Sequence, residues 1–346
     1  MNTVISSPHS LFSNSVTRMM LLVVAGLIPG YIAYVYFFGW GVIINSALCV
    51  LTAFLCEAGV LRLRQRPLWP YLTDGSALVT ALLLALALPP ILPWWLAVLA
   101  TMFAMLLAKH LYGGLGYNPF NPAMVGYAIL LIAFPKYMTA WLPARGEHLS
   151  LSLLDNLRYN LFGTLPLDMH FDALTQATPL DKLHIQLSLG KTVGETVADF
   201  HQFSGLYGVG WDWVSIAFLV GGLFLIYKRV ISWQIPVAML GSLAIIATIA
   251  WLVDANTYPN PLFHIFGGAS MLGAFFIATD PVSASTTPRG RLIYGAGVGI
   301  ITYVIRAWGG YPDGVAFGVL LMNLAAPTID QYTQPRVFGH DQAKRP

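Results

Sequence analysis

The stretch DGSALVTALLLALALPP, residues 74–90, decides the fold because it is a long apolar run with helix-breaking residues at both ends. An Asp-Gly pair precedes the run, and two prolines close it. A helix that crosses a membrane needs about 20 apolar residues, whereas shorter apolar pieces bounded by Gly or Pro are typical of half-helices or re-entrant segments. The stretch therefore predicts a broken helix inside a membrane, with Ser76 at its start.

A second stretch of the same kind, GGASMLGAFFIATDP, occupies residues 267–281. Each stretch is followed by a basic residue, a Gly-Gly pair and another apolar run, namely Lys109, Gly113-Gly114 and YNPFNPAMVGYAILL in one half, and Arg306, Gly309-Gly310 and YPDGVAFGVLL in the other. With an odd number of spans in each half, a true repeat would be inverted across the membrane. The alternative is that these Gly and Ala residues only let helices pack closely.

The composition of the whole chain agrees with a membrane protein. Of 346 residues, 57% are hydrophobic and 10% are charged, against about 45–50% and about 25% in soluble domains. A soluble enzyme is excluded, and the net charge of +3 is too small and scattered to predict nucleic-acid binding. The two cysteines, Cys49 and Cys56, cannot form a disulfide framework or a four-Cys metal site, so we expect them to pack.

We predict an all-α, polytopic integral membrane protein with about ten transmembrane segments in two five-helix halves. The domains are expected to be a first half at 1–134, a long extracytoplasmic loop at 135–212, and a second half with a cytoplasmic tail at 213–346. The ten segments lie near residues 20–38, 41–61, 75–88, 92–108, 122–134, 213–227, 233–253, 263–279, 292–308 and 314–327.

Positive charge predicts the orientation, because Lys and Arg collect in cytoplasmic loops. With the N-terminus inside, 12 of the 18 basic residues fall on the cytoplasmic side, namely Arg18, Arg62, Arg64, Arg66, Lys109, Lys228, Arg229, Arg289, Arg291, Arg336, Lys344 and Arg345. Both termini are then cytoplasmic and the loop 135–212 faces outward.

Acidic residues within apolar segments are candidates for an ion path, because an ionised carboxylate is costly in hydrocarbon. Glu57 lies inside a span, although pairing with Arg62 or Arg64 is an equally good explanation. Asp280 lies at a segment end, where turn formation is the ordinary role of Asp. The broken segments suggest an ion path that includes Glu57, Ser76, Ser270 and Asp280. No His pair has metal-ligand spacing, and we expect no metal site.

The loop contains one stretch of special interest, DALTQATPLD at residues 172–181. On physical grounds alone, Thr178 followed by Pro179 is a helix N-cap with proline at the first helical position. However, the combination of Asp172, Thr175, Ala177 and Thr178 resembles the signal at which a flavin transferase joins FMN, through its phosphate, to a threonine hydroxyl. The commoner signal has Gly directly after the Asp, where this chain has Ala173.

Longer stretches extend this resemblance over nearly the whole chain. They are KHLYGGLGYNPFNPAMVGY from Lys109, ATPLD from Ala177, MLGAFFIATDPVSASTTPRGRLIYG from Met271 and GGYPDGVAFGVLL from Gly309. Together they are similar to the NqrB/RnfD family. Its members are membrane subunits of the Rnf (Rsx) ion-translocating oxidoreductases, which the chain resembles more, and of the sodium-translocating NADH:quinone reductases, which it resembles more distantly.

The resemblance implies a subunit of the bacterial inner membrane that carries one covalent FMN at Thr178, with the loop 135–212 in the periplasm. The flavin, and no catalytic side chain, would carry the redox chemistry. Electron transfer between NADH and ferredoxin-type carriers would be coupled to movement of sodium ions or protons. The implied partners are subunits A, B, C, E and G of the complex and a flavin transferase for maturation. The family is also associated with a noncovalent riboflavin, to which no residue can be assigned.

Two other functions remain open at this point. The first is a stand-alone channel or secondary transporter with an inverted repeat and no redox role, since family members are thought to share their membrane fold with ammonium and urea channels. The second is a structural anchor for other subunits, in which Thr178 stays unmodified. Flavin content discriminates among the three.

Overall fold

The computed structural model describes residues 16–145, 151–165, 171–200, 203 and 205–334, and it is built from helices, with no strand among these residues. The helices before the long loop are α1 (Val16–Phe38), α2 (Gly41–Leu63), α3 (Trp69–Leu72), α4 (Ser76–Ala87), α5 (Trp94–Met102), its π-helical continuation η1 (Phe103–His110), and α6 (Pro122–Ala133). The prediction of an all-α polytopic membrane protein is confirmed.

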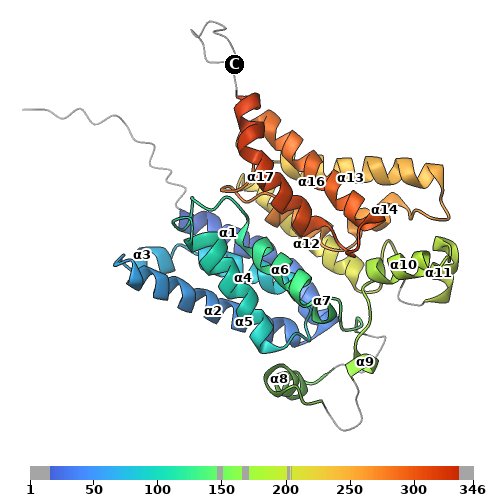
Figure 1. The fold of residues 1–346 in the computed structure, drawn as a ribbon, viewed down its shortest axis with the longest axis horizontal. Coiled ribbons are helices and arrows are strands. Elements are labelled where there is room, and N and C mark those ends of the chain that lie inside the picture. The colour runs from blue at the N-terminus through green and yellow to red at the C-terminus, as the bar shows by residue number, and fades with distance from the viewer. Residues whose placement is uncertain (1–15, 146–150, 166–170, 201–202, 204, 335–346) are drawn as a thin grey trace, which may run out of the picture.

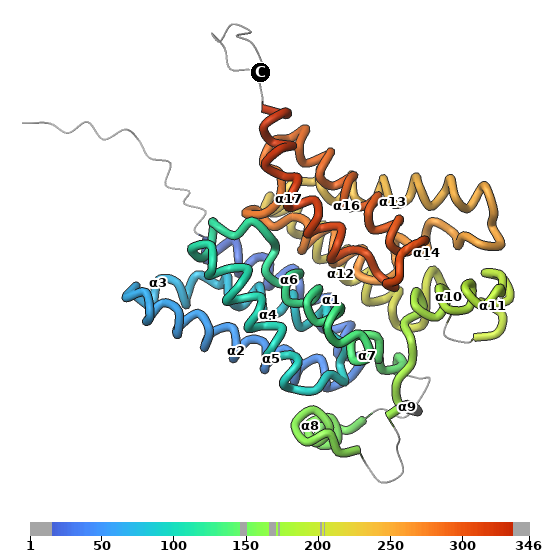
Figure 2. Tube along the Cα trace, in the orientation of Figure 1, coloured from blue at the N-terminus to red at the C-terminus, as the bar shows by residue number. Residues whose placement is uncertain are grey.

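The loop contributes short helices, and a second set of long helices follows it. The loop elements are α7 (Pro135–Met138), α8 (Leu153–Phe162), α9 (Phe171–Leu174), α10 (Pro179–Ser188) and α11 (Val193–Asp199). The second set comprises α12 (Trp211–Tyr227), α13 (Gln234–Val253), α14 (Pro261–Phe266), α15 (Ser270–Leu272) with its π-helical continuation η2 (Gly273–Ile277), α16 (Pro288–Trp308) and α17 (Val315–Thr333). Figures 1 and 2 show the two sets side by side, with the loop helices at one end of the bundle.

Four helical stretches among the described residues are long and apolar enough to cross a membrane, at Val16–Phe38, Gly41–Leu63, Trp69–Ala87 and Gln234–Val253. Shorter apolar helices occupy Trp94–His110, Pro122–Ala133 and Trp211–Tyr227. The long helices expose large apolar side chains on their outer faces, such as Leu55 of α2 and Ile245 of α13 at 64% and 63% exposure. Contact with lipid requires such apolar faces. The exact number of spans stays a prediction.

Helices α1 and α12 join the two sets through a close backbone contact. A Cβ placed on Gly221 of α12 would lie 1.9 Å from the carbonyl oxygen of Gly26 in α1. A Cβ on Gly30 would likewise overlap the ring of Phe218. Small residues at these crossings let the two backbones approach each other, which is how helices associate in a membrane.

The two stretches that suggested the fold are both broken helices, and they run in opposite directions. Ser76, at the start of α4, lines the same cavity as Thr279 and Asp280, which follow η2. Leu86 and Ala87, in the last turn of α4, line another cavity together with Gly268 and Ala269, which precede α15. Each broken helix therefore begins where the other ends, which is the arrangement that an inverted repeat requires.

The ends of the broken helices leave backbone carbonyl groups that need partners. Asn45 Nδ2 donates to the carbonyl oxygen of Pro89 at 2.8 Å, and Asn121 Nδ2 donates to that of Ile277 at 3.2 Å. The expected single segment at 263–279 is in fact interrupted, because α14 ends at Phe266 and Gly268 has a φ of +56°. The Gly-Gly pair thus separates two helices instead of continuing one.

Candidate functional site

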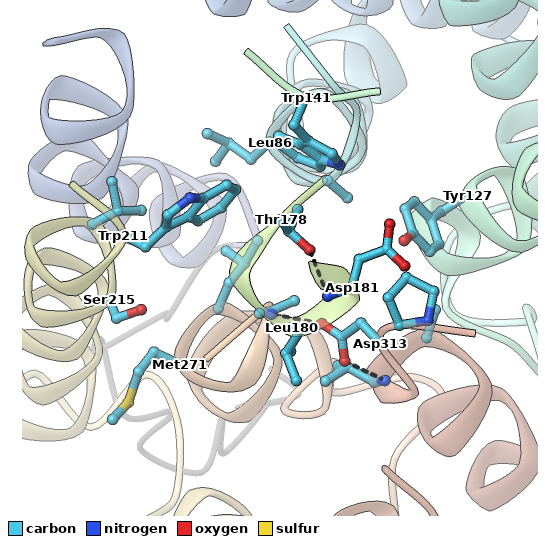
Figure 3. A pocket seen from close by; sticks show the side chains of 18 of the residues that line it. Leu86, Tyr127, Trp141, Thr178, Leu180, Asp181, Trp211, Ser215, Met271 and Asp313 are labelled. Carbon is cyan, nitrogen blue, oxygen red and sulfur yellow. Dashed lines mark hydrogen bonds between the residues drawn. The ribbon is translucent and has the colours of Figure 1, made fainter. Parts of the chain in front are cut away.

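A cavity lies where the loop meets both sets of helices, and Thr178 is in its wall. It contains about 980 Å³ of empty space, including space open to solvent. Figure 3 shows part of its lining, which is contributed by α1, α4, α6, α10, α12, α15, α17 and the loops between them. We refer to it as the threonine cavity.

Thr178 is the N-cap of α10, as the sequence predicted. Its side-chain oxygen accepts a hydrogen bond from the backbone N–H of Asp181 at 3.3 Å, and Pro179 occupies the first helical position. The backbone N–H of Leu180 donates to the hydroxyl of Tyr207 at 3.1 Å. The half-buried threonine hydroxyl is thus held at the wall of the cavity, at the positive end of a helix dipole.

Aromatic rings form the apolar part of this cavity. Trp141 and Trp211 stack edge to face with their centroids 5.2 Å apart, and Tyr34 contacts both rings. Tyr127 lines the opposite side (Figure 3). The position of Trp141 is fixed by two backbone hydrogen bonds with Gln176, of 3.1 and 2.8 Å. The segment that carries the threonine is therefore tied to the aromatic wall two residues before Thr178.

Asp181 brings an acidic group to the same cavity. Burial raises the pKa of this carboxyl above its usual 3.8, and His184 partly opposes the shift. A carboxyl with a raised pKa is more easily protonated, which lowers the cost of placing a second negative group nearby.

The other residues of the proposed attachment signal lie just before Thr178. The hydroxyl of Thr175 donates to the carbonyl oxygen of Phe171 at 3.0 Å, which closes the short helix α9. Ala177 is half-buried beside the cavity segment. Asp172 belongs to α9, but its side chain lies outside the described part of the chain.

A buried cluster of polar groups surrounds the start of α4. Lys109 Nζ donates to Glu57 Oε1 at 2.7 Å and to the hydroxyl of Ser76 at 2.8 Å. Ser76 in turn donates to Asp74 Oδ1 at 2.6 Å. The side chains of Glu57 and Lys109 are each 2% exposed. Glu57 therefore pairs with Lys109. The alternative from the sequence, a pair with Arg62 or Arg64, is not what the structure shows.

A matching cluster surrounds the start of α15. Arg306 donates to the hydroxyl of Ser270 at 2.9 Å and to Asp313 Oδ1 at 2.9 Å, and it also binds the carbonyl oxygens of His264 and Gly267. The other oxygen of Asp313 accepts the backbone N–H of Ala269 at 2.7 Å. In both clusters a basic residue that precedes a Gly-Gly pair holds the serine that starts a broken helix.

A second cavity between the halves adjoins the cluster of Lys109 and Ser76. It contains about 890 Å³ of empty space, and Ser76, Lys109 and Asp280 lie in its wall. Asp280 accepts hydrogen bonds from the hydroxyl of Ser283 at 2.8 Å and from the N–H of Val282 at 3.3 Å. Its carboxylate therefore stabilises a turn, the ordinary role of such a residue, while facing the cavity.

The candidates for the ion path fall into two places. Ser76, Asp280 and, through Lys109, Glu57 gather around this second cavity, whereas Ser270 lies in the other cluster, fully buried. Among the residues that the structure describes, no group of three His, Cys, Asp or Glu side chains could hold a metal ion.

The sequence analysis missed Lys109, Arg306 and Asp313 as members of the site. The charge pattern counted Lys109 among the cytoplasmic basic residues, but Lys109 is buried, as is Arg306, at 1% and 4% exposure. The signal that could have found them is their equivalent position in the two halves. A buried cation needs a buried partner, and the repeat pairs each cation with a serine at the start of a broken helix.

These broken helices, which run in opposite directions with a buried charge cluster at the start of each, define a polytopic membrane protein with an internal repeat. A family model described as the NQR2, RnfD, RnfE family matches residues 3–339, so the chain belongs to this family.

Relatives in this family share about half of their residues with the chain. A protein of Aliivibrio salmonicida is 51% identical over 343 residues, covering 97% of both chains. One of Yersinia pseudotuberculosis is 51% identical over 344 residues with the same coverage, and one of Aeromonas hydrophila is 50% identical over 348 residues, covering 98% of this chain and 99% of the relative. All three are named as the subunit of an ion-translocating oxidoreductase complex that is designated D.

Proposed function

We propose that this protein is a membrane subunit of an ion-translocating oxidoreductase complex and that it carries FMN covalently at Thr178. The first part rests on the family and on the names of its relatives. The second rests on one observation, namely that the hydroxyl of Thr178 lies in the wall of a cavity lined by aromatic rings.

The residues around the threonine cavity fit a flavin. Rings such as those of Trp141, Trp211 and Tyr127 pack favourably against a flat aromatic group, and all three line the cavity beside Thr178. A phosphate ester on Thr178 would lie at the N-terminus of the ten-residue helix α10, where the helix dipole favours negative charge. Asp181 and Asp313 also line the cavity and would be unfavourable neighbours of a phosphate, although the charge of Asp313 is balanced by Arg306.

Formation of the bond requires another protein. A threonine hydroxyl becomes a nucleophile only with a base beside it. The partner of Thr178 in the structure is a backbone N–H, which cannot accept a proton. A flavin transferase would therefore make the phosphoester from a flavin dinucleotide: the Thr178 oxygen would form the new P–O bond, the transferase would take its proton, and the nucleoside monophosphate would leave. Thr178 would act as the substrate of this enzyme and then as the tether. When bound, the flavin supplies acceptance and release of electrons.

The ion path is proposed to follow the broken helices. Ser76, Lys109 and Asp280 line the second cavity, and Glu57 balances the charge of Lys109. On the other side, Ser270 and Asp313 adjoin the threonine cavity. A flavin there would lie beside one end of the path, so its change of charge would act on the cluster of Arg306 over a short distance. Sodium ion and proton both remain candidates for the coupling ion.

The remaining parts of the proposal come from the family. The subunit would lie in the bacterial inner membrane with both termini cytoplasmic and the loop 135–212 periplasmic. Its partners would be subunits A, B, C, E and G of the Rnf complex, and electrons would pass between NADH and ferredoxin-type carriers. A noncovalent riboflavin would be a further cofactor, without assigned residues. The halves 1–134 and 213–346 would form the membrane domain.

The test is in-gel ultraviolet fluorescence of the denatured protein, expressed with and without the flavin transferase. We expect a fluorescent band only with the transferase, and no band for Thr178→Val. Thr192→Val is the matched control, because Thr192 also caps a loop helix by accepting an N–H, that of Glu195 at 3.2 Å, and this variant should keep its flavin. A dark wild-type band beside an active transferase would refute the attachment and favour the channel or the anchor.

A further inference from the structure

A third cavity lies where α2 ends, between the loop after α2 and the loop after η1. It contains about 1,260 Å³ of empty space, and its lining includes Arg64, Arg66, Tyr71, His110 and Glu57. It is separate from the threonine cavity and independent of the flavin proposal. We refer to it as the arginine cavity.

The two arginines are held by the turn that ends α2. Gln65 has a φ of +53°, a left-handed conformation that is uncommon for a residue with a side chain. The N–H of Arg66 donates to the carbonyl oxygen of Leu61 at 2.9 Å, which is the hydrogen bond of a Schellman motif. This turn directs Arg64 to the carbonyl oxygen of His110 at 2.6 Å and Arg66 to that of Gly113 at 3.4 Å.

The charge of this cavity is positive. Its one carboxylate, Glu57, is already paired with Lys109. Each guanidinium has five N–H donors, and these contacts to carbonyl groups use a small part of them. Arginine forms paired hydrogen bonds with phosphate oxygens, so a phosphate group would balance the charge of Arg64 and Arg66.

The floor of the cavity has an acceptor without a partner. Glu57 Oε2 is buried and has no hydrogen-bond partner among the described residues, although the side chain is 2% exposed and adjoins the cavity. A buried oxygen without a hydrogen-bond partner is unfavourable, because it has lost its contacts with water. A hydroxyl group that enters the cavity could donate to it.

Around the mouth of the cavity, apolar and aromatic side chains are exposed to the surroundings. Leu63, Trp69, Leu111 and Tyr117 are 85%, 78%, 65% and 72% exposed. Exposed Trp and Tyr are typical of the interface between lipid headgroups and acyl chains. Basic pockets between membrane helices at this level bind anionic headgroups.

We propose that the arginine cavity binds the headgroup of an anionic phospholipid with a glycerol headgroup. Arg64 and Arg66 would hold the phosphodiester, and a glycerol hydroxyl would donate to Glu57 Oε2. The acyl chains would lie along the exposed apolar residues at the mouth. The lipid would fasten the end of α2 to the loop that follows the buried Lys109.

The test is native mass spectrometry of the full chain, titrated with phosphatidylglycerol, phosphatidic acid or phosphatidylcholine of equal chain length. Phosphatidylglycerol should bind tightest, because it alone has both the anionic phosphodiester and the hydroxyl groups. Loss of two charge-assisted contacts in the variant Arg64→Gln/Arg66→Gln should weaken binding by about tenfold or more. Arg289→Gln removes an exposed arginine that is not part of the cavity lining and should change binding by less than about twofold.

Two further measurements keep the outcome clear. The variant Arg64→Lys/Arg66→Lys keeps the charge but loses the planar fork, so it should bind with intermediate affinity. Free glycerol 3-phosphate should compete weakly, and competition equal to that of the lipid would show that a soluble phosphate ester is the true ligand. Equal binding of phosphatidylcholine, or equal weakening by Arg289→Gln, would overturn the proposal.

Discussion

The buried pair of Lys109 and Glu57 gives the sharpest stability prediction. Lys109→Met removes an ammonium group that is 1% exposed and bonded at 2.7 Å to Glu57 and at 2.8 Å to Ser76. Glu57 would remain as a buried carboxylate with no cation at its oxygens. Breaking a buried ion pair in this way costs about 3–5 kcal/mol, a large part of the roughly 5–15 kcal/mol that is typical of total stability.

The assay is equilibrium unfolding in mixed detergent micelles, followed by tryptophan fluorescence. The double variant Glu57→Leu/Lys109→Met should recover most of the loss, because replacing both charges by apolar groups is often neutral. Lys136→Met, at an exposed lysine of α7, is the control and should change stability by less than about 0.5 kcal/mol. A single variant as stable as the control, or a double variant in which the two losses add, would refute the reasoning.

Three other predictions follow from particular contacts. Gly221→Ala places a Cβ 1.9 Å from a backbone oxygen of α1, so it should lower the midpoint temperature of thermal unfolding, at a cost of about 1–3 kcal/mol. The control Gly241→Ala in α13 meets nothing within 4 Å and should leave this temperature unchanged or raise it. Equal midpoint temperatures for the two variants would contradict the close contact at Gly221. The pKa of Asp181 is raised by burial, so folding retains a proton that the unfolded chain releases, and stability should fall as pH rises from about 3.8 through the raised pKa. The gain in stability from Asp181→Asn should therefore be present at neutral pH and shrink toward about pH 4, and a gain independent of pH would count against it. Asn45→Ala removes the hydrogen-bond donor to the carbonyl oxygen that follows α4. In the same micelle assay it should lower the free energy of unfolding by about 1–3 kcal/mol, and an unchanged free energy of unfolding would contradict this role.

The apolar pattern of the sequence predicted most of the fold. The runs at 74–90 and 267–281 are broken helices in the structure, as their Gly and Pro ends suggested. The segment expected near 263–279 contains the Gly-Gly pair that opens the second broken helix, but hydropathy alone cannot register the left-handed turn that Gly268 makes between α14 and α15. A backbone conformation of that kind depends on the close packing of Asp313 and Arg306 around the turn.

The candidate site was less predictable because its contacts join residues that are far apart in the sequence. Lys109 pairs with Glu57 across 52 positions, and Arg306 reaches Ser270 across 36. Charge rules place such cations at the membrane boundary, because they consider each residue without its partner. Thr178 was different, since its helix-capping role follows from the adjacent Pro179 and a local hydrogen bond.

The cavity beside Thr178 could not be predicted from local sequence at all. Its aromatic wall combines Tyr34 of α1, Tyr127 of α6, Trp141 of the loop and Trp211 of α12. These residues approach one another only when both sets of helices and the loop are assembled. The sequence suggested Thr178 as an attachment point, and in the structure this residue lines a cavity with aromatic walls.

The central claim is a covalent flavin at Thr178, and peptide mass spectrometry of the protein purified from its native membrane tests it most directly. The account predicts that the proteolytic peptide with Thr178 is heavier by one FMN less one water, with fragment ions that place the added mass on this threonine. A peptide found only in its unmodified mass, from a complex that still transfers electrons, would contradict the account.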